Sequence, residues 1–199
     1  MLRRTASINY RPYPGGVEIG ESFFPLVTSF RVWLFFDNLI RDPATTTREI
    51  IDFLISQYVA DRPRDPEKAV IGGLAFYQKK PYKEVSRRFH MKPEERKSGR
   101  QQPPVYDFEY DAEPIKAAFL QAYRIDLETA EDLHWHRFLS LFEFLPADTE
   151  IKQRIRYRSM DLGKITDKKE RERVRKIQRD IRIPSRQKPT DAEIGAAFW

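Results

Sequence analysis

The chain has 199 residues and a mass of 23.7 kDa, which is long enough for one domain, or two small ones, with an apolar core that needs no cross-links. It contains no cysteine, which excludes disulfides, thiolate metal sites and cysteine nucleophiles and favours a reducing compartment. Lys and Arg number 36 against 30 Asp and Glu, and the net charge of +6 raises the question of nucleic acid binding without answering it.

The N-terminal sequence MLRRTASINYRPYPGG has no apolar segment of the length found in signal peptides. The longest apolar runs, such as VWLFF, are far shorter than a membrane-spanning helix. We therefore expect a soluble, cytosolic protein that makes no contact with a membrane. The spacing of the apolar residues predicts a mainly α fold, a bundle-like arrangement of several helices with a small N-terminal β-hairpin.

The first predicted elements are a hairpin and an unusually apolar helix. GVEIGESFFPL predicts a hairpin that turns near Gly20 and Glu21. Residues 30–40 predict a helix on which Phe30 and Leu34 face one side, while the broad opposite side carries Val32, Trp33, Phe35, Phe36, Leu39 and Ile40. Such a helix either lies at the centre of a core or reserves part of its surface for a partner. Phe30 and Leu34 could form a groove for a partner helix, or they could pack under the hairpin.

Two further helices carry start signals. Thr46 and Glu49 have the spacing of a capping box before IIDFLISQY, and Asp65 followed by Pro66 is a typical N-cap and first turn. The second of these helices contains two glycines at 72–73, each of which costs about 1 kcal/mol relative to alanine. A close backbone approach at these glycines would be one way to offset that cost.

A basic stretch follows, which we interpret as a solvated linker. Residues 79–100 contain nine basic and three acidic residues, a net charge of +6, and Gln-Gln-Pro-Pro follows directly. High charge, few apolar side chains and proline are typical of a linker. We therefore divide the chain into an N-terminal hairpin with helices at 1–79, a basic, proline-containing linker at 80–104, and a C-terminal helical region at 105–199 with a basic last helix and a tail.

The C-terminal region begins with an alternating segment. VYDFEYD alternates aromatic and acidic residues, which predicts a short strand or an extended lead-in. Asp111 then caps a helix, one face of which carries Ile115, Ala118, Phe119 and Ala122. Thr129, with Asp132 as its capping-box partner, predicts the start of another helix that runs through Leu145.

The segment DLHWHRF holds two of the three histidines of the chain. On a helix, His134 falls within the apolar arc, whereas His136 lies far round, beside Glu143. Because residues two apart point to different sides of a helix, the two histidines could not share a metal ion. We therefore expect His134 to be a core residue with one hydrogen bond and His136 to be a surface residue. The alternative, His134 as a lone general base, has no serine or carboxylate partner at a recognisable spacing.

Three acidic residues offer a second candidate site. Asp107, Glu109 and Asp111 would share one face of an extended segment and could bind the magnesium of a nuclease, with Lys116 nearby. The spacing to Lys116 does not fit the usual acid-x-lysine arrangement, so we favour a solvated strand face that runs into a helix cap. No glycine-rich phosphate loop is present in the sequence. We therefore expect a protein that is not an enzyme and holds neither metal nor cofactor, with a hydrolase built on Asp107, Glu109 and His134 as the enzymatic alternative.

Two more helices are expected at about 149–161 and 167–181. Residues 164–188 contain eleven Lys or Arg and four acidic residues, a net charge of +7. The last helix has only a narrow apolar stripe, formed by Val174, Ile177 and Ile181. Its charge would suit DNA or RNA phosphates, but no reader helix, stacking platform or zinc finger accompanies it, and a basic helix docks on an acidic protein equally well.

Several segments together point to a known family: FRVWLFFDNLIRD, DPEKAVIGGLAFYQ, YDFEYDAEPIKAAFLQAYRIDLETAEDLHWHRF and YRSMDLGKITDKKERER. With them, residues 17–185 resemble the small siphophage protein family named after gene product fifteen. YDFEYDAEPI, YRIDL, DLHW and YRSMDL are the most specific of the motifs. Relatives tend to carry a second tryptophan after Trp135, where this chain has His136, so a paired-histidine site is not part of the family pattern.

The resemblance implies a non-enzymatic tail assembly chaperone, because members are usually encoded between the major tail protein and the tape measure protein. The implied partners are those two phage proteins and further copies of the chain, and the alternative is a basic nucleic-acid-binding protein. The implied location is the cytoplasm of the bacterial host, with no copy retained in the mature virion. As candidate partner-binding residues we take Phe30 and Leu34 on the first long helix and Arg171, Arg175 and Arg179 on the last.

Overall fold

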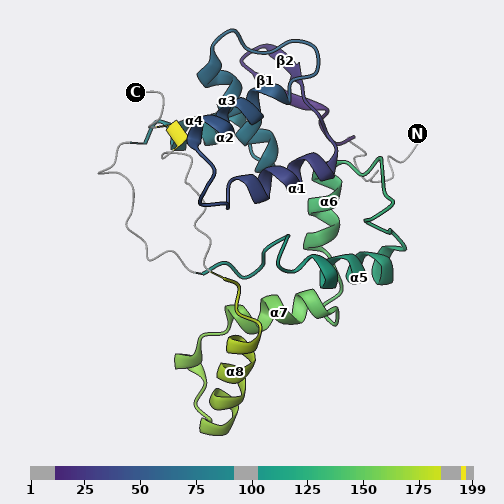
Figure 1. Cartoon of the computed structure of the whole chain (residues 1–199), viewed down its shortest axis with the longest axis vertical. Helices are drawn as coiled ribbons and strands as arrows, with labels where there is room; N and C mark the ends of the chain where they lie inside the picture. The colour runs from purple at the N-terminus through teal and green to yellow at the C-terminus, as the bar shows by residue number, and fades with distance from the viewer. Residues whose placement is uncertain (1–11, 92–102, 185–193, 196–199) are drawn as a thin grey trace, which may run out of the picture.

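The computed structural model describes residues 12–91, 103–184 and 194–195 of the chain. Within these ranges eight α-helices follow one two-stranded antiparallel sheet (Figure 1), which confirms the mainly α fold with an N-terminal hairpin. The elements are β1 (Gly16–Ile19), β2 (Ser22–Pro25), α1 (Phe30–Leu39), α2 (Thr47–Ser56), α3 (Pro66–Tyr77), α4 (Tyr82–Phe89), α5 (Ala112–Tyr123), α6 (Trp135–Glu143), α7 (Glu150–Ser159), the 3-10 turn η2 (Leu162–Lys164) and α8 (Lys168–Asp180). No helix in the described ranges is long and apolar enough to cross a membrane.

The hairpin turns at the predicted place and lies against α3. Gly20 follows β1 with a φ of +65°, a conformation that glycine adopts without strain. A side chain at Gly72 of α3 would collide with the hydroxyl of Tyr58 and press on Val17 and Ile19 of β1. The segments that approach this glycine closely do so through side chains and not through backbone, and this approach lets the hairpin rest directly on the helix.

One apolar core runs through the described part of the chain. Trp33 and Phe36 of α1 are fully buried, with ring centroids 5.2 Å from Phe76 and 4.9 Å from Tyr77 of α3, respectively. Trp135 of α6, from the other side of the expected linker, stacks on Tyr77 at 5.7 Å. Buried side chains on both sides of that linker therefore belong to the same core.

Helices α2 and α3 begin at the predicted caps. The Thr46 hydroxyl accepts a hydrogen bond from the Glu49 N–H, and the Glu49 carboxylate accepts one from the Thr46 N–H at 2.7 Å. Asp65 accepts from the Glu67 N–H at 3.0 Å, and Pro66 occupies the first turn of α3. Local sequence is sufficient at both starts, because each cap and its partner are only a few residues apart.

Part of the stretch that we interpreted as a solvated linker is helical instead. Helix α4 occupies residues 82–89, and its Val85 and Phe89 are buried in the core. Lys83 and Arg87 lie on the exposed side of the same helix. The linker interpretation is therefore wrong for this part, because two apolar side chains four residues apart suffice to pack a charged helix against α3. Residues 92–102 lie outside the described ranges.

The segment VYDFEYD forms turns rather than the predicted strand. The Asp107 carboxylate accepts hydrogen bonds from the N–H groups of Glu109 and Tyr110 at 3.0 and 2.9 Å, and the Asp107 carbonyl accepts from the Asp111 N–H at 2.9 Å. Aspartate side chains that bind nearby N–H groups favour turns over extended backbone, which overrides the alternating pattern. Asp111 does precede α5, but its side chain makes no capping hydrogen bond.

The helix predicted from Thr129 begins six residues later, at Trp135. A turn at residues 126–130 comes first. The backbone then pairs with the segment ahead of α1, since the Leu133 carbonyl accepts a hydrogen bond from the Phe30 N–H at 2.9 Å. This pairing keeps the chain extended up to the start of α6, and it depends on a segment about a hundred residues away that local capping signals do not report.

Helices α7 and α8 confirm the two helices predicted at 149–161 and 167–181. In Figure 1, α8 lies at the lower end of the molecule, where it packs against α7. Val174 of α8 is fully buried, and Gln178 donates hydrogen bonds to the carbonyls of Tyr157 and Met160, both at 2.8 Å. These contacts place the apolar stripe of α8 on α7 and leave its remaining surface to solvent.

Candidate partner-binding surface

The two histidines of DLHWHRF occupy the reverse of their predicted positions. His136 is 4% exposed, and its Nε2 lies 2.7 Å from the Phe76 carbonyl. Burial lowers the pKa of His136 to about 4, so this ring is neutral at pH 7. His134 is only partly buried, because it is the N-cap residue of α6 rather than a member of the helix. The two assignments were wrong because they assumed a helix that starts at residue 129.

Both ring nitrogens of His134 are used within the fold. Its Nδ1 accepts a hydrogen bond from the His136 N–H at 3.0 Å, so its Nε2 carries the proton and donates to the Pro14 carbonyl at 3.1 Å. Burial lowers the pKa of His134 as well. This arrangement makes His134 a structural cap and gives it no geometry for general-base catalysis. No group of three or more His, Cys, Asp or Glu side chains in the described ranges could hold a metal ion.

The three acidic residues of VYDFEYD do not share a face. Asp107 and Asp111 are buried, and Glu109 is exposed. The Asp111 carboxylate accepts two hydrogen bonds from the Arg158 guanidinium, at 2.6 and 2.9 Å. Asp107 lies 3.3 Å from Nη1 of Arg41. Arg41 also pairs with Asp37 at 2.7 Å. The two buried carboxylates therefore lie beside arginines of the fold, which is a structural role and not that of a magnesium site.

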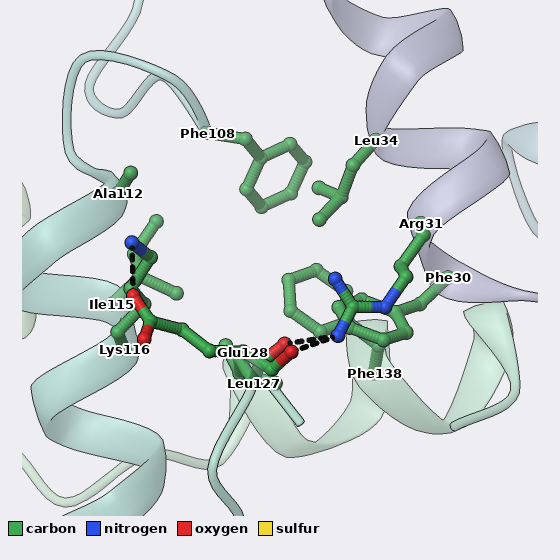
Figure 2. A pocket seen from close by; sticks show the side chains of 10 residues that line it. All are labelled: Phe30, Arg31, Leu34, Phe108, Ala112, Ile115, Lys116, Leu127, Glu128 and Phe138. Carbon is green, nitrogen blue, oxygen red and sulfur yellow. Dashed lines mark hydrogen bonds and ion pairs between the residues drawn. The ribbon is translucent and has the colours of Figure 1, made fainter. Parts of the chain in front are cut away.

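A cavity of about 380 Å³ opens between α1, α5, α6 and the turn at residues 126–130 (Figure 2). Six of its ten lining side chains are large and apolar: Phe30, Leu34, Phe108, Ile115, Leu127 and Phe138. The volume is at the lower end of the range of about 300–1,000 Å³ that is typical of ligand sites. The cavity is therefore suited to one or two bulky apolar groups.

The charged rim of the cavity is satisfied within the chain (Figure 2). Arg31 donates hydrogen bonds to the carbonyls of Leu127 and Glu128 at 2.9 and 2.6 Å. Lys116 pairs with Glu113 at 2.8 Å and with Glu128 at 2.9 Å, and these hydrogen bonds raise its pKa to about 12. An occupant of the cavity would consequently find apolar contacts at the floor, and each charged side chain that lines the cavity already has hydrogen-bond partners within the chain.

The structure brings Phe30 and Leu34 together as two walls of this cavity. Phe30 is buried and stacks on Phe138 at 5.4 Å, so it does not pack under the hairpin. The exposed aromatic residue of α1 is instead Phe35, which is 58% exposed and lies 5.7 Å from Phe53 of α2. The sequence analysis placed Phe35 on the core side, because a helical wheel does not show which neighbouring helices cover it.

The three arginines selected on the last helix lie elsewhere. In Figure 1, α8 is at the opposite end of the molecule from the hairpin and is separated from α1 by α5 and α7. Arg171 donates hydrogen bonds to the carbonyls of Ile165 and Thr166, at 2.9 and 3.3 Å, and so closes the turn before α8. Arg175 and Arg179 are exposed. The predicted partner-binding residues thus form two separate surfaces, one apolar and one basic.

One comparison with known proteins identifies a relationship that covers most of the chain. A family model described as "Bacteriophage Gp15 protein" matches residues 12–183, which includes helices α1 to α8 and both strands of the hairpin. No curated protein and no solved structure gives a significant match.

Proposed function

The chain belongs to the bacteriophage Gp15 protein family, and we propose that it is a non-enzymatic tail assembly chaperone that binds the tape measure protein of a long-tailed phage. In this role it would bring major tail protein subunits to the tape measure protein in the cytoplasm of the host. Several copies would coat one tape measure chain and leave before the virion is complete. The observation that carries the proposal is the apolar cavity beside α1.

The cavity suits a helical partner that presents bulky apolar side chains. Phe30 and Leu34 lie one turn apart on α1, and Ile115 of α5 and Phe138 of α6 form other walls of the same cavity. A long apolar-striped helix would aggregate if left uncovered, and a groove that takes side chains spaced three or four residues apart would shield it. Burial of one large apolar side chain is worth about 1.5–3 kcal/mol, or roughly a tenfold to hundredfold gain in affinity.

The decisive experiment is co-expression with the tape measure protein of the same phage genome. We expect the wild-type chain to keep that protein in the soluble fraction and to co-purify with it. Ala112→Leu fills the cavity from the first turn of α5, so it should reduce capture by about tenfold or more. Ala117→Leu is the matched control, because Ala117 is exposed on the same helix and does not line the cavity.

Two outcomes would contradict different parts of the proposal. If the wild-type chain neither solubilises nor retains the tape measure protein, the chaperone role is wrong. If it does both, but Ala112→Leu and Ala117→Leu behave alike while both variants fold normally by circular dichroism, the role stands and the cavity is not the binding site.

A second candidate function, binding of nucleic acid, is favoured by the exposed basic face of α8. Arg175 and Arg179 are exposed and lie one turn apart, at a spacing that could follow neighbouring phosphates. A salt titration of DNA binding tests this function. If Arg175 and Arg179 contact phosphates, the affinity for DNA should fall steeply with salt and fall further when both arginines are replaced by glutamate. Weak binding whose affinity is the same after both changes would contradict a nucleic-acid-binding function.

A further inference from the structure

Opposite charges are segregated along the C-terminal half of the chain. Residues 103–149 contain three Lys or Arg and ten Asp or Glu, a net charge of −7. Residues 150–184 contain thirteen Lys or Arg and six Asp or Glu, a net charge of +7. The first of these stretches holds α5 and α6, and the second holds α7 and α8. The two stretches therefore differ in sign of charge, although the side chains of Asp107, Asp111 and Arg158 are buried in ion pairs and do not contribute to the surface.

The basic surface has a helix face without a partner in its own chain. Helix α8 packs on α7 through Val174 and Gln178, and this packing leaves Arg175 and Arg179 exposed. The ion pairs of α8 in the described ranges are Arg173 with Glu170 and a contact of 3.8 Å between Arg179 and its neighbour Asp180. Within the same ranges Arg175 makes no ion pair.

The acidic surface combines carboxylates with exposed apolar area. Phe144, directly after α6, is 75% exposed. The exposed acids Glu143 and Asp148 flank it, and neither side chain forms an ion pair in the part of the chain that the structure describes. An exposed aromatic ring with carboxylates one and four residues away along the chain complements a pair of arginines, because a guanidinium stacks on a ring and hydrogen-bonds to a carboxylate.

We propose that α8 of one copy docks on the Glu143–Asp148 surface of a second copy, with Arg175 and Arg179 beside Phe144. The two surfaces are different patches of the molecule, so the contact is head to tail and leaves one patch of each kind unoccupied at the ends of the assembly. Such contacts build open chains of copies and not closed dimers. This inference does not rest on the tape measure protein or on the cavity.

A second copy fits this basic face better than nucleic acid does. The exposed acids of residues 103–149, Glu143 and Asp148 among them, lie in the same molecule and would repel a phosphate backbone locally. The same acids attract the α8 face of another copy. Recognition by opposite charges also predicts an association that weakens by about tenfold or more between about 50 and about 500 mM NaCl.

Sedimentation velocity of the full chain over a range of concentrations tests the contact. We expect the wild-type chain to form oligomers of increasing size at low salt. Arg175→Glu with Arg179→Glu should weaken the association by about a hundredfold or more, because like charges would then meet across the contact. Lys83→Glu with Arg87→Glu is the matched control, since it changes the net charge equally at two exposed positions with the same spacing on α4.

Mixing two defective variants distinguishes a head-to-tail contact from other contacts. The Arg175→Glu, Arg179→Glu variant keeps the acidic surface, and a Glu143→Lys, Asp148→Lys variant keeps the basic one. Each should be monomeric alone, whereas an equimolar mixture should form mixed oligomers in which the two variants alternate, because the intact surfaces attract each other and so do the two reversed ones. All four changes in one chain restore opposite charges and should restore the oligomers.

Several results would overturn the proposal. A wild-type chain that stays monomeric at all concentrations and low salt has no such contact. If Lys83→Glu with Arg87→Glu weakens the association as much as Arg175→Glu with Arg179→Glu does, the association depends only on the net charge of the chain. If the chain is monomeric and binds DNA through Arg175 and Arg179, the basic face of α8 is a nucleic-acid-binding surface instead.

Discussion

The ion cluster around Asp111 should be one of the most sensitive points of the fold. Asp111 is fully buried at the start of α5, and it accepts two hydrogen bonds from Arg158 and one, at 3.1 Å, from the Asp107 N–H. Arg154 adds a longer contact of 3.4 Å. The Arg158 side chain is only 6% exposed. Asp111→Ala therefore leaves the Asp107 N–H without its acceptor and the buried guanidinium of Arg158 without a counter-charge. The guanidinium still donates to the Ile181 and Val105 carbonyls.

Loss of one partner of a buried ion pair costs about 3–5 kcal/mol, because the remaining charge is uncompensated. For a chain of this size, that loss corresponds to a fall in melting temperature of roughly 6–20 °C. Urea and thermal unfolding, followed by circular dichroism, would measure it. Arg48→Ala is the matched control: Arg48 pairs with Asp52 at 3.7 Å on the surface, and its loss should change stability by less than about 1 kcal/mol.

A double-mutant cycle separates the burial of an unpaired charge from simple loss of packing. In the Asp111→Ala background, Arg158→Met removes the unpaired guanidinium while it keeps much of the side-chain volume, so it should recover part of the lost stability. If Asp111→Ala costs less than about 1 kcal/mol, or if Arg158→Met adds its full single-mutant cost on top, the two residues do not act as a buried pair and this reasoning fails.

Two further predictions concern single buried positions. The pKa of His136 is about 4 in the folded chain and about 6.5 in the unfolded chain. The contribution of the neutral ring to the free energy of unfolding is therefore fully present above pH 6.5, and it decreases as the pH drops towards 4. Between pH 6.5 and pH 4, urea unfolding should show that the free energy of unfolding falls by about 2–4 kcal/mol more for the wild type than for His136→Gln. An equal fall in the two proteins would contradict a neutral buried ring at position 136. Gly72→Ala should destabilise the fold by about 1–3 kcal/mol, because the added methyl group meets the Tyr58 hydroxyl, whereas Gly15→Ala, with nothing within 4 Å, should have little effect on the melting temperature.

Features that depend on neighbouring residues could be predicted from the sequence alone. The caps at Thr46 and Asp65, the hairpin turn at Gly20, and the two final helices are all found where the local pattern indicates. The physical reason is that a cap or a turn is completed by groups only a few residues away. The need for close packing at Gly72 was also predictable, because a glycine inside a helix is costly without such a contact, although side chains make the contact rather than backbone.

The candidate sites, in contrast, depend on contacts between distant segments. Phe30 and Leu34 can be selected from the sequence because they lie on one side of an apolar helix. The cavity, however, is formed only where Phe108, Ile115 and Phe138 of three other segments pack around them. The exposed Phe35 was missed for the same reason.

The sequence by itself determined the fold class, most of the helices, the caps at Thr46 and Asp65 and the distribution of charge along the chain. Only the tertiary structure decided which histidine is buried and that α4 packs on the core. In each of these cases, a backbone or side-chain partner from far along the chain outweighs the local preference. Phe30, for example, pairs with Leu133 and so delays the start of α6 until Trp135.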